Sequence, residues 1–215
     1  MILVLITACV ALAIAGGWRI LRRAPYPGLP PAVRDERLPQ EFSVALDRAR
    51  ADVERAPQRA EPVRRLASLY QANGLLAEAR ACYQRIAELE SGLSAQDHYA
   101  LADLALGLGD LETAKIELTR TLEREPNYLP AQIRLGEAFF KTGELDSAGK
   151  AYASALQVQA DQPQAVVGLA RCELQRGDDD AAVTRLERLV ADRPESAAAA
   201  GLLAQILERR GHPDR

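Results

Sequence analysis

The chain has 215 residues, which is enough for one ordinary domain or for a domain with appended segments. Apolar residues make up 48% and charged residues 27%, as in folded globular domains, which argues against a mainly disordered chain. The net charge of −3 lacks the basic excess that non-specific binding to nucleic acid requires, so no nucleic-acid partner is expected.

The first predicted element is an apolar segment at the N-terminus. Residues 2–18 carry no charge, and the apolar run continues past Arg19 to Leu21. As a helix this run would span roughly 30 Å, the thickness of the hydrocarbon core of a bilayer. Trp18 and Arg19 are residue types that suit the membrane interface. We therefore expect residues 1–23 to form a single transmembrane helix with a basic flank.

The sequence allows more than one prediction for the side of the membrane on which residues 41–215, the body of the chain, lie. Arg19, Arg22 and Arg23 follow the apolar run, so the positive-inside rule favours a cytoplasmic body. A cleaved signal peptide is disfavoured because no basic residue precedes the run. The residues before and including Cys9 resemble the lipobox of bacterial lipoproteins, in which case a lipidated Cys9 would place the body in the periplasm.

Residues 24–40 are predicted to be a proline-rich linker. Five prolines fall within fifteen positions: Pro25, Pro27, Pro30, Pro31 and Pro39. This density disfavours both helix and strand and is typical of a semi-rigid, extended spacer. Such a spacer would hold the body away from the membrane surface.

The remaining residues, 41–215, contain an internal repeat. Three sets of positions recur with the same spacing of 35, 34 and 34 residues. The sets are the glycines Gly74, Gly109, Gly143 and Gly177, the alanines Ala79, Ala114, Ala148 and Ala182, and the leucines Leu66, Leu101, Leu135 and Leu169. A fixed period of this length is typical of a solenoid in which each unit is one supersecondary structure.

Each unit has the pattern of two helices joined by a tight turn. The leucine and the small residue after it lie on a first helix, where the small side chain lets the partner helix approach closely. The glycine ends this helix because it adopts the left-handed conformation without strain. The alanine lies on the second helix, which ends at a proline in two units, Pro126 and Pro194.

The order of small residue, aromatic, glycine, alanine and aromatic resembles the tetratricopeptide repeat, a helix–turn–helix unit of 34 residues. The third unit reads Gly136, Phe139, Gly143, Ala148 and Tyr152, and the first reads Ala67, Tyr70, Gly74, Ala79 and Tyr83. The first aromatic is missing from the second and fourth units, and the family's early Trp is replaced by Val63, His98, Gln132 and Val166. The resemblance implies an all-α, right-handed superhelical solenoid of antiparallel helix pairs.

The period also predicts the limits of the repeats. Full repeats are expected at about 60–94, 95–128, 129–162 and 163–196. A half repeat at 41–58 would precede them, and a capping half repeat at 197–211 would follow. The last helix has no predicted partner after it, so it would leave an apolar strip exposed for self-association or for a partner.

No motif for catalysis, cofactor binding or metal binding is found. The phosphate-loop, dinucleotide-binding, zinc-protease and serine-hydrolase motifs are missing from the sequence. His98 is interpreted as a packing or capping residue, and Cys82 and Cys172 as buried residues of helices. Asp178, Asp179 and Asp180 are interpreted as the acidic cap of a second helix rather than as a metal site. We therefore expect no enzyme activity, no cofactor and no metal.

The resemblance also implies where a partner would bind. First helices of such stacks line a concave groove, and the family's groove positions correspond to ten residues here. They are Arg64, Ser68, Tyr99, Asp103, Ile133, Arg134, Glu137, Phe140, Val167 and Arg171. The set combines apolar side chains with charges of both signs, and its arginines suit the carboxylates of a partner. The Lys–Asn clamp that some family members use for a terminal carboxylate is not reproduced.

The leading hypothesis is a membrane-tethered, non-catalytic scaffold or adaptor. It would bind a protein or peptide partner in the concave groove and take part in the assembly or regulation of an envelope complex. One alternative is a structural protein that self-associates through its last helix. Another is an assembly factor of the same kind that faces the periplasm, as a lipoprotein or by the opposite insertion.

Overall fold

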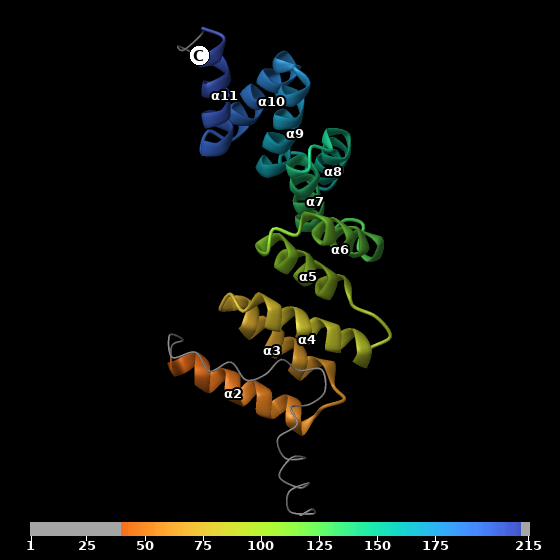
Figure 1. Cartoon of the computed structure of the whole chain (residues 1–215). Helices are drawn as coiled ribbons and strands as arrows, with labels where there is room; N and C mark the ends of the chain where they lie inside the picture. Colours follow the sequence, from red (N-terminus) through yellow and green to blue (C-terminus); the bar gives the residue numbers. More distant parts are fainter. Residues whose placement is uncertain (1–39, 212–215) are drawn as a thin grey trace, which may run out of the picture. The chain divides into compact units, whose positions relative to one another are not determined.

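The structure, a computed structural model, describes residues 40–211 and is entirely helical in that range (Figure 1). The predicted anchor at 1–23, including Cys9, and residues 24–39 of the predicted linker lie outside the described residues. Among residues 40–211, no helix has the length and apolar character needed to cross a membrane. The first described helix begins at Gln40, which is the last residue of the predicted linker.

The chain divides into two compact units. The first ends at Gly92 and contains α2 (Gln40–Arg55), α3 (Ala60–Ala72) and α4 (Leu76–Leu89). The second begins at Leu93 and contains α5 (Ala95–Gly107), α6 (Leu111–Arg124), α7 (Leu129–Lys141), α8 (Leu145–Val158), α9 (Pro163–Arg176), α10 (Asp179–Asp192) and α11 (Ala197–Arg209). The predicted all-α solenoid of helix pairs is confirmed for the described residues.

The turns between the helices of each pair use glycine in the left-handed conformation, as predicted. Gly74, Gly109, Gly143 and Gly177 have φ values of 74°, 74°, 80° and 83°. The N–H of the residue after each glycine donates to a carbonyl five residues earlier, as from Asp178 to Glu173 at 2.9 Å. This arrangement satisfies carbonyl groups that the end of a helix leaves without partners. The regular spacing of these glycines in the sequence therefore reflects the regular spacing of helix ends in the structure.

Polar side chains cap several helix starts in the second unit. Ser94 and Asp97 form a reciprocal capping box at α5, and Asp110 accepts from the Thr113 N–H at 3.1 Å. Asp178 accepts from the Ala181 N–H at 3.3 Å, so its predicted capping role is confirmed. The two acids that follow Asp178 instead pair with arginines of α11 (Asp179 with Arg209 at 2.7 Å and Asp180 with Arg210 at 2.8 Å).

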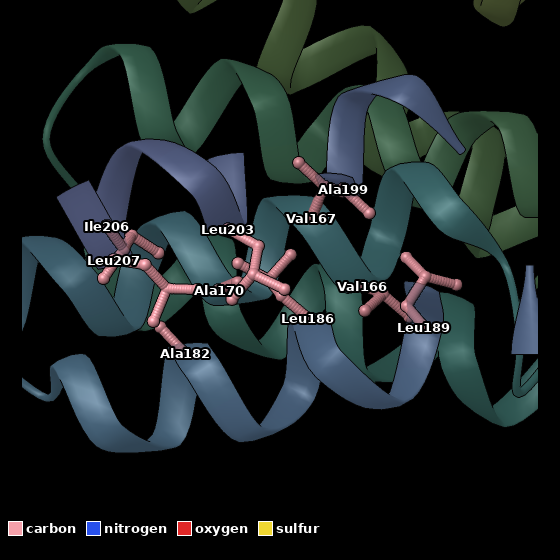
Figure 2. Packing of buried hydrophobic residues seen from close by; sticks show 10 residues of the cluster. All are labelled: Val166, Val167, Ala170, Ala182, Leu186, Leu189, Ala199, Leu203, Ile206 and Leu207. Carbon is pink, nitrogen blue, oxygen red and sulfur yellow. The ribbon is translucent and has the colours of Figure 1, made fainter. Parts of the chain in front are cut away.

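The core of each unit forms where small residues bring helices together. Figure 2 shows one cluster in which α9, α10 and α11 contribute side chains that point toward one another, including Ala170, Ala182 and Leu203. Ala170 and Ala182 are fully buried, because each lies where two helix axes approach closely. Cys82 and Cys172 are also fully buried, as predicted. Burial of such apolar surface contributes about 25 cal/mol per Å² to folding.

Candidate functional site

The first helices of the second unit form its more closed side. Successive first helices touch directly, α7 with α9 and α9 with α11. On the other side, pockets of about 430 Å³ and 650 Å³ lie between successive second helices. Because the helices converge on one side and diverge on the other, the first helices line the inner surface of this unit.

A polar and aromatic cluster occupies this surface at α5 and α7. The Arg134 Nε donates to the Tyr99 hydroxyl at 3.1 Å, and its Nη2 lies 3.0 Å from an Asp103 carboxylate oxygen. The Tyr99 ring meets the edge of Tyr128, with centroids 5.1 Å apart and planes at 84°. Burial lowers the pKa of Arg134, but the bond to Tyr99 and the nearby acids raise it by more, so the guanidinium stays charged. The structure thus brings three predicted site residues together.

The other predicted site residues of α7 and α9 differ in their exposure. Glu137 and Arg171 are exposed, and neither forms an ion pair within the described residues. Phe140 is half-buried at the edge of a core cluster. Ile133 and Val167 are only 7% and 6% exposed and belong to core clusters. These two apolar side chains therefore support the fold and offer little surface to a partner.

The two predicted site residues in the first unit lie on α3. Both guanidinium nitrogens of Arg64 donate to the Glu90 carboxylate, which follows α4. The Ser68 hydroxyl donates to the Arg64 carbonyl at 3.1 Å, a local bond within the helix. A bidentate pair of this kind has defined geometry, so Arg64 is engaged inside its own unit rather than free for a partner.

Tyr152 and Gly168 were not predicted as site residues, and both are buried where the first helices α7 and α9 meet. Tyr152 comes from the second helix α8, and its ring lies between Gly136 of α7 and Gly168 of α9. The signal in the sequence was weak, because Gly168 has no glycine at the equivalent position of the other repeats. Tyr128, whose ring contacts Tyr99, was also missed, since it precedes α7 in a turn.

His98 has the structural role that its position predicted. It is 7% exposed, and its Nδ1 lies 2.6 Å from the carboxylate of Glu117, which is also 7% exposed. The other oxygen of that carboxylate accepts from Arg120 at 2.7 Å. The contact joins α5 to α6 within one helix pair. Within residues 40–211, no group of three His, Cys, Asp or Glu residues is arranged to hold a metal ion.

The two pockets on the second-helix side occupy equivalent positions of successive repeats. Lining residues that correspond, 34 positions apart, are Leu122 and Leu156, Gln132 and Val166, and Lys150 and Thr184. Gln132 Nε2 donates to the Pro126 carbonyl at 2.8 Å, which fixes the orientation of the amide. Its Oε1 is enclosed and has no partner among the described residues. The pockets follow from the divergence of the second helices.

Comparison with known proteins identifies the repeat. Models of the tetratricopeptide repeat match residues 65–92, 99–165 and 145–206. A search of curated proteins finds no significant match. Together the three matched ranges cover more than half of the chain.

Solved structures share the fold at low sequence identity. A structure of MamA is 21% identical with a TM-score of 0.68, over 73% of this chain and 91% of that one. MamA from Desulfovibrio magneticus RS-1 is 15% identical with a TM-score of 0.66, over 73% and 88%. YrrB, described as a tetratricopeptide-repeat protein with an unusual peptide-binding site, is 17% identical with a TM-score of 0.67, over 75% and 83%. The described part of this chain is therefore an array of tetratricopeptide repeats, a scaffold of the protein-interaction type.

Proposed function

We propose that the chain is a membrane-tethered, non-catalytic adaptor that holds an extended segment of a partner protein on the first helices of its second unit. One observation carries the proposal: exposed charges of both signs, Glu137 and Arg171, stand on this surface without ion-pair partners among the described residues. Beside them, Phe140 and Tyr99 offer half-buried aromatic surface. A partner that satisfies the charges and covers the rings gains both specificity and buried area.

Two further facts favour this function over catalysis. Among residues 40–211, the one histidine and most of the acids that a catalytic site would use are engaged in structural contacts, as in the His98–Glu117 pair and the Asp178 cap. A protein of the same fold, YrrB, is described as having a peptide-binding site. Its likeness to this chain concerns the fold, so the chemistry of the bound segment must come from the residues of this surface.

A charge-reversal variant tests the binding surface. Glu137→Lys combined with Arg171→Glu reverses two exposed charges and breaks no ion pair within residues 40–211. We expect partner recovery by affinity purification to fall at least tenfold, since misplaced charges at an interface cost several kcal/mol. The matched control reverses Glu123 and Lys150, which are exposed on second helices. If the wild type and both variants recover the partner equally well, the proposed binding surface is wrong.

The membrane tether is a separate part of the proposal and rests on the uncharged run at residues 2–18. Deletion of residues 1–23 should move the protein from the membrane fraction to the soluble fraction. Protease protection in intact cells and in spheroplasts distinguishes a cytoplasmic body from a periplasmic one. The proposed role in assembling or regulating an envelope complex depends on this tether and requires that the recovered partner be an envelope protein.

A further inference from the structure

The Tyr152 ring of the second helix α8 packs between the first helices α7 and α9. The side chain is 3% exposed. A Cβ added at Gly136 would lie 2.7 Å from its Cε1, and one added at Gly168 would lie 2.3 Å from its Cζ. Because real Cβ atoms do not come this close, an alanine at either position would force the ring or a helix to move. The tip of the ring therefore lies beside α9, between two first helices.

The hydroxyl at the end of this ring has no partner in the protein. Tyr152 makes no hydrogen bond with any residue in the range 40–211. Its oxygen is also not enclosed, since the one unpaired and fully enclosed side-chain atom in that range is Oε1 of Gln132. A buried tyrosine usually finds a partner for its hydroxyl. Here the hydroxyl has no such partner among the described residues, and it keeps a small solvent-accessible area at the end of a ring that lies beside Gly168 of α9.

Two opposite charges, one on each of the neighbouring first helices, act on this hydroxyl. Glu137 follows Gly136 on α7, and Arg171 lies one turn after Gly168 on α9. Both are close enough for their charges to act on the phenol. Burial raises the pKa of Tyr152, Glu137 raises it further, and Arg171 lowers it by less. The hydroxyl therefore stays protonated and is a donor at physiological pH.

We propose that Tyr152, Glu137 and Arg171 form a subsite that binds one main-chain peptide group of an extended partner segment. This inference rests on the proposed function, because the segment must lie on the first helices. A neutral group with a donor and an acceptor matches a hydroxyl between opposite charges. The peptide C=O accepts from the Tyr152 hydroxyl or from Arg171, and the peptide N–H donates to Glu137. An anion would meet attraction from Arg171 and repulsion from Glu137.

The chemistry of this subsite differs from that of the rest of the surface. A peptide group occurs at every residue of a partner, so the subsite holds the segment in place without selecting a sequence. Selection then depends on the side chains that meet Phe140 and the cluster of Tyr99, Asp103 and Arg134. The division matches the general pattern in which main-chain bonds contribute affinity and side-chain contacts contribute specificity.

The experiment uses linear peptides selected on the full chain from a random library displayed on phage. Tyr152→Phe removes only the hydroxyl, so its thermal unfolding temperature should equal that of the wild type. The affinity of the selected peptides should fall about 3- to 10-fold, as expected for the loss of one hydrogen bond. Methylation of each peptide nitrogen in turn should reveal one position at which wild-type binding is lost. This loss should shrink in Glu137→Gln, because the neutral amide oxygen accepts more weakly than the carboxylate and the same contact is already weakened.

The matched control is Tyr70→Phe, which removes a fully buried hydroxyl that accepts a hydrogen bond from Arg50 at 2.9 Å. It should lower stability and leave peptide affinity unchanged. Wild-type affinity in Tyr152→Phe, or a methylation scan that is the same in the wild type and Glu137→Gln, overturns the inference. If the reversal of Glu137 and Arg171 still abolishes binding in that case, the proposed function stands. If no peptide is selected, or the selected peptides bind the reversal variant normally, the proposed function fails, and the subsite fails with it.

Discussion

Tyr70 in the first unit and Tyr152 in the second both have buried rings, but their hydroxyl groups have different surroundings. In the first unit, Tyr70 is fully buried and its hydroxyl accepts from Arg50 of α2. In the second unit, Tyr152 has no hydrogen-bond partner among the described residues, and its hydroxyl is not fully enclosed. The first arrangement ties a helix to its neighbour. The second leaves a donor available.

The charged residues of the first helices show the same contrast. Arg64 of α3 is held by Glu90 within the first unit. At the groove positions of α7 and α9, Glu137 and Arg171 have no ion pair in the described residues. Arg64 thus consolidates the fold of the first unit, whereas the second unit has both a paired groove arginine, Arg134 with Asp103, and the unpaired charges of Glu137 and Arg171. The comparison predicts that stability and recognition can be changed separately.

The largest expected effect concerns the glycines that make room for Tyr152. Gly168→Ala would place a Cβ 2.3 Å from the ring, so α9 or the ring must move. Overpacking of this kind costs about 1–3 kcal/mol, more than the roughly 1 kcal/mol that Ala gains over Gly inside a helix. We expect a lower free energy of unfolding in urea titrations. Tyr152→Leu in the same chain should recover part of the loss, because Leu occupies this position in the second and fourth repeats as Leu118 and Leu186.

A second glycine provides the control for this prediction. Gly201 lies within α11, and a Cβ added there has no atom within 4 Å. Gly201→Ala should therefore raise the free energy of unfolding by about 0.5–1 kcal/mol. If Gly168→Ala is as stable as Gly201→Ala, the ring does not fill the space between α7 and α9. The hydroxyl would then have no fixed place on the inner surface.

A smaller effect is expected at alkaline pH in the first unit. Burial raises the pKa of the Cys82 thiol from its ordinary value of 9.0 to about 12. Below pH 9 the thiol is protonated in both states, and its contribution to stability is complete. Above pH 9 the unfolded thiol ionises while the folded one stays neutral, so the free energy of unfolding falls by about 1.4 kcal/mol per pH unit until the folded pKa is reached.

Hydrogen exchange in α3 and α4, measured between pH 8 and pH 10.5 after correction for the intrinsic rate, follows this change. Cys82→Ala should lose stability at neutral pH because of the cavity, but it should show a flatter dependence on pH. Cys172 of the second unit also has a raised pKa caused by burial, and Cys172→Ala serves as the comparison. An unchanged slope in Cys82→Ala would assign the alkaline sensitivity to other groups, such as the buried Tyr70, whose pKa is also raised.

The fold was predictable because its signals are local. Glycine at a left-handed helix end, alanine at a close helix crossing and proline after a helix act within a few residues, so a period in the sequence becomes a period in space. The cap at Asp178 was predictable for the same reason. The predicted anchor stays a prediction, since it lies outside the described residues.

The candidate site was only partly predictable, because the exposure and the ion pairing of its side chains depend on residues far apart in the sequence. Arg64 meets Glu90, 26 positions away, and no local pattern shows that this arginine is engaged. Ile133 and Val167 stand at groove positions, but the curvature of the stack decides how much of each remains exposed. Tyr152 was recognised only as an aromatic of the repeat, and the place of its ring beside α9 depends on the single glycine at Gly168 in the next repeat.

The smallest expected effect tests the charge contrast directly. Arg64→Ala removes a partly exposed ion pair and should lower the free energy of unfolding by less than about 1 kcal/mol. Arg171→Ala removes a charge with no ion pair in the described residues and should leave stability unchanged while weakening the selected peptides. Urea titration measures the free energy of unfolding of each variant, and peptide titration measures its affinity for the selected peptides. If Arg64→Ala weakened binding as much as Arg171→Ala, the Arg64–Glu90 pair would have to open for the partner, and the contrast between the units would be one of degree.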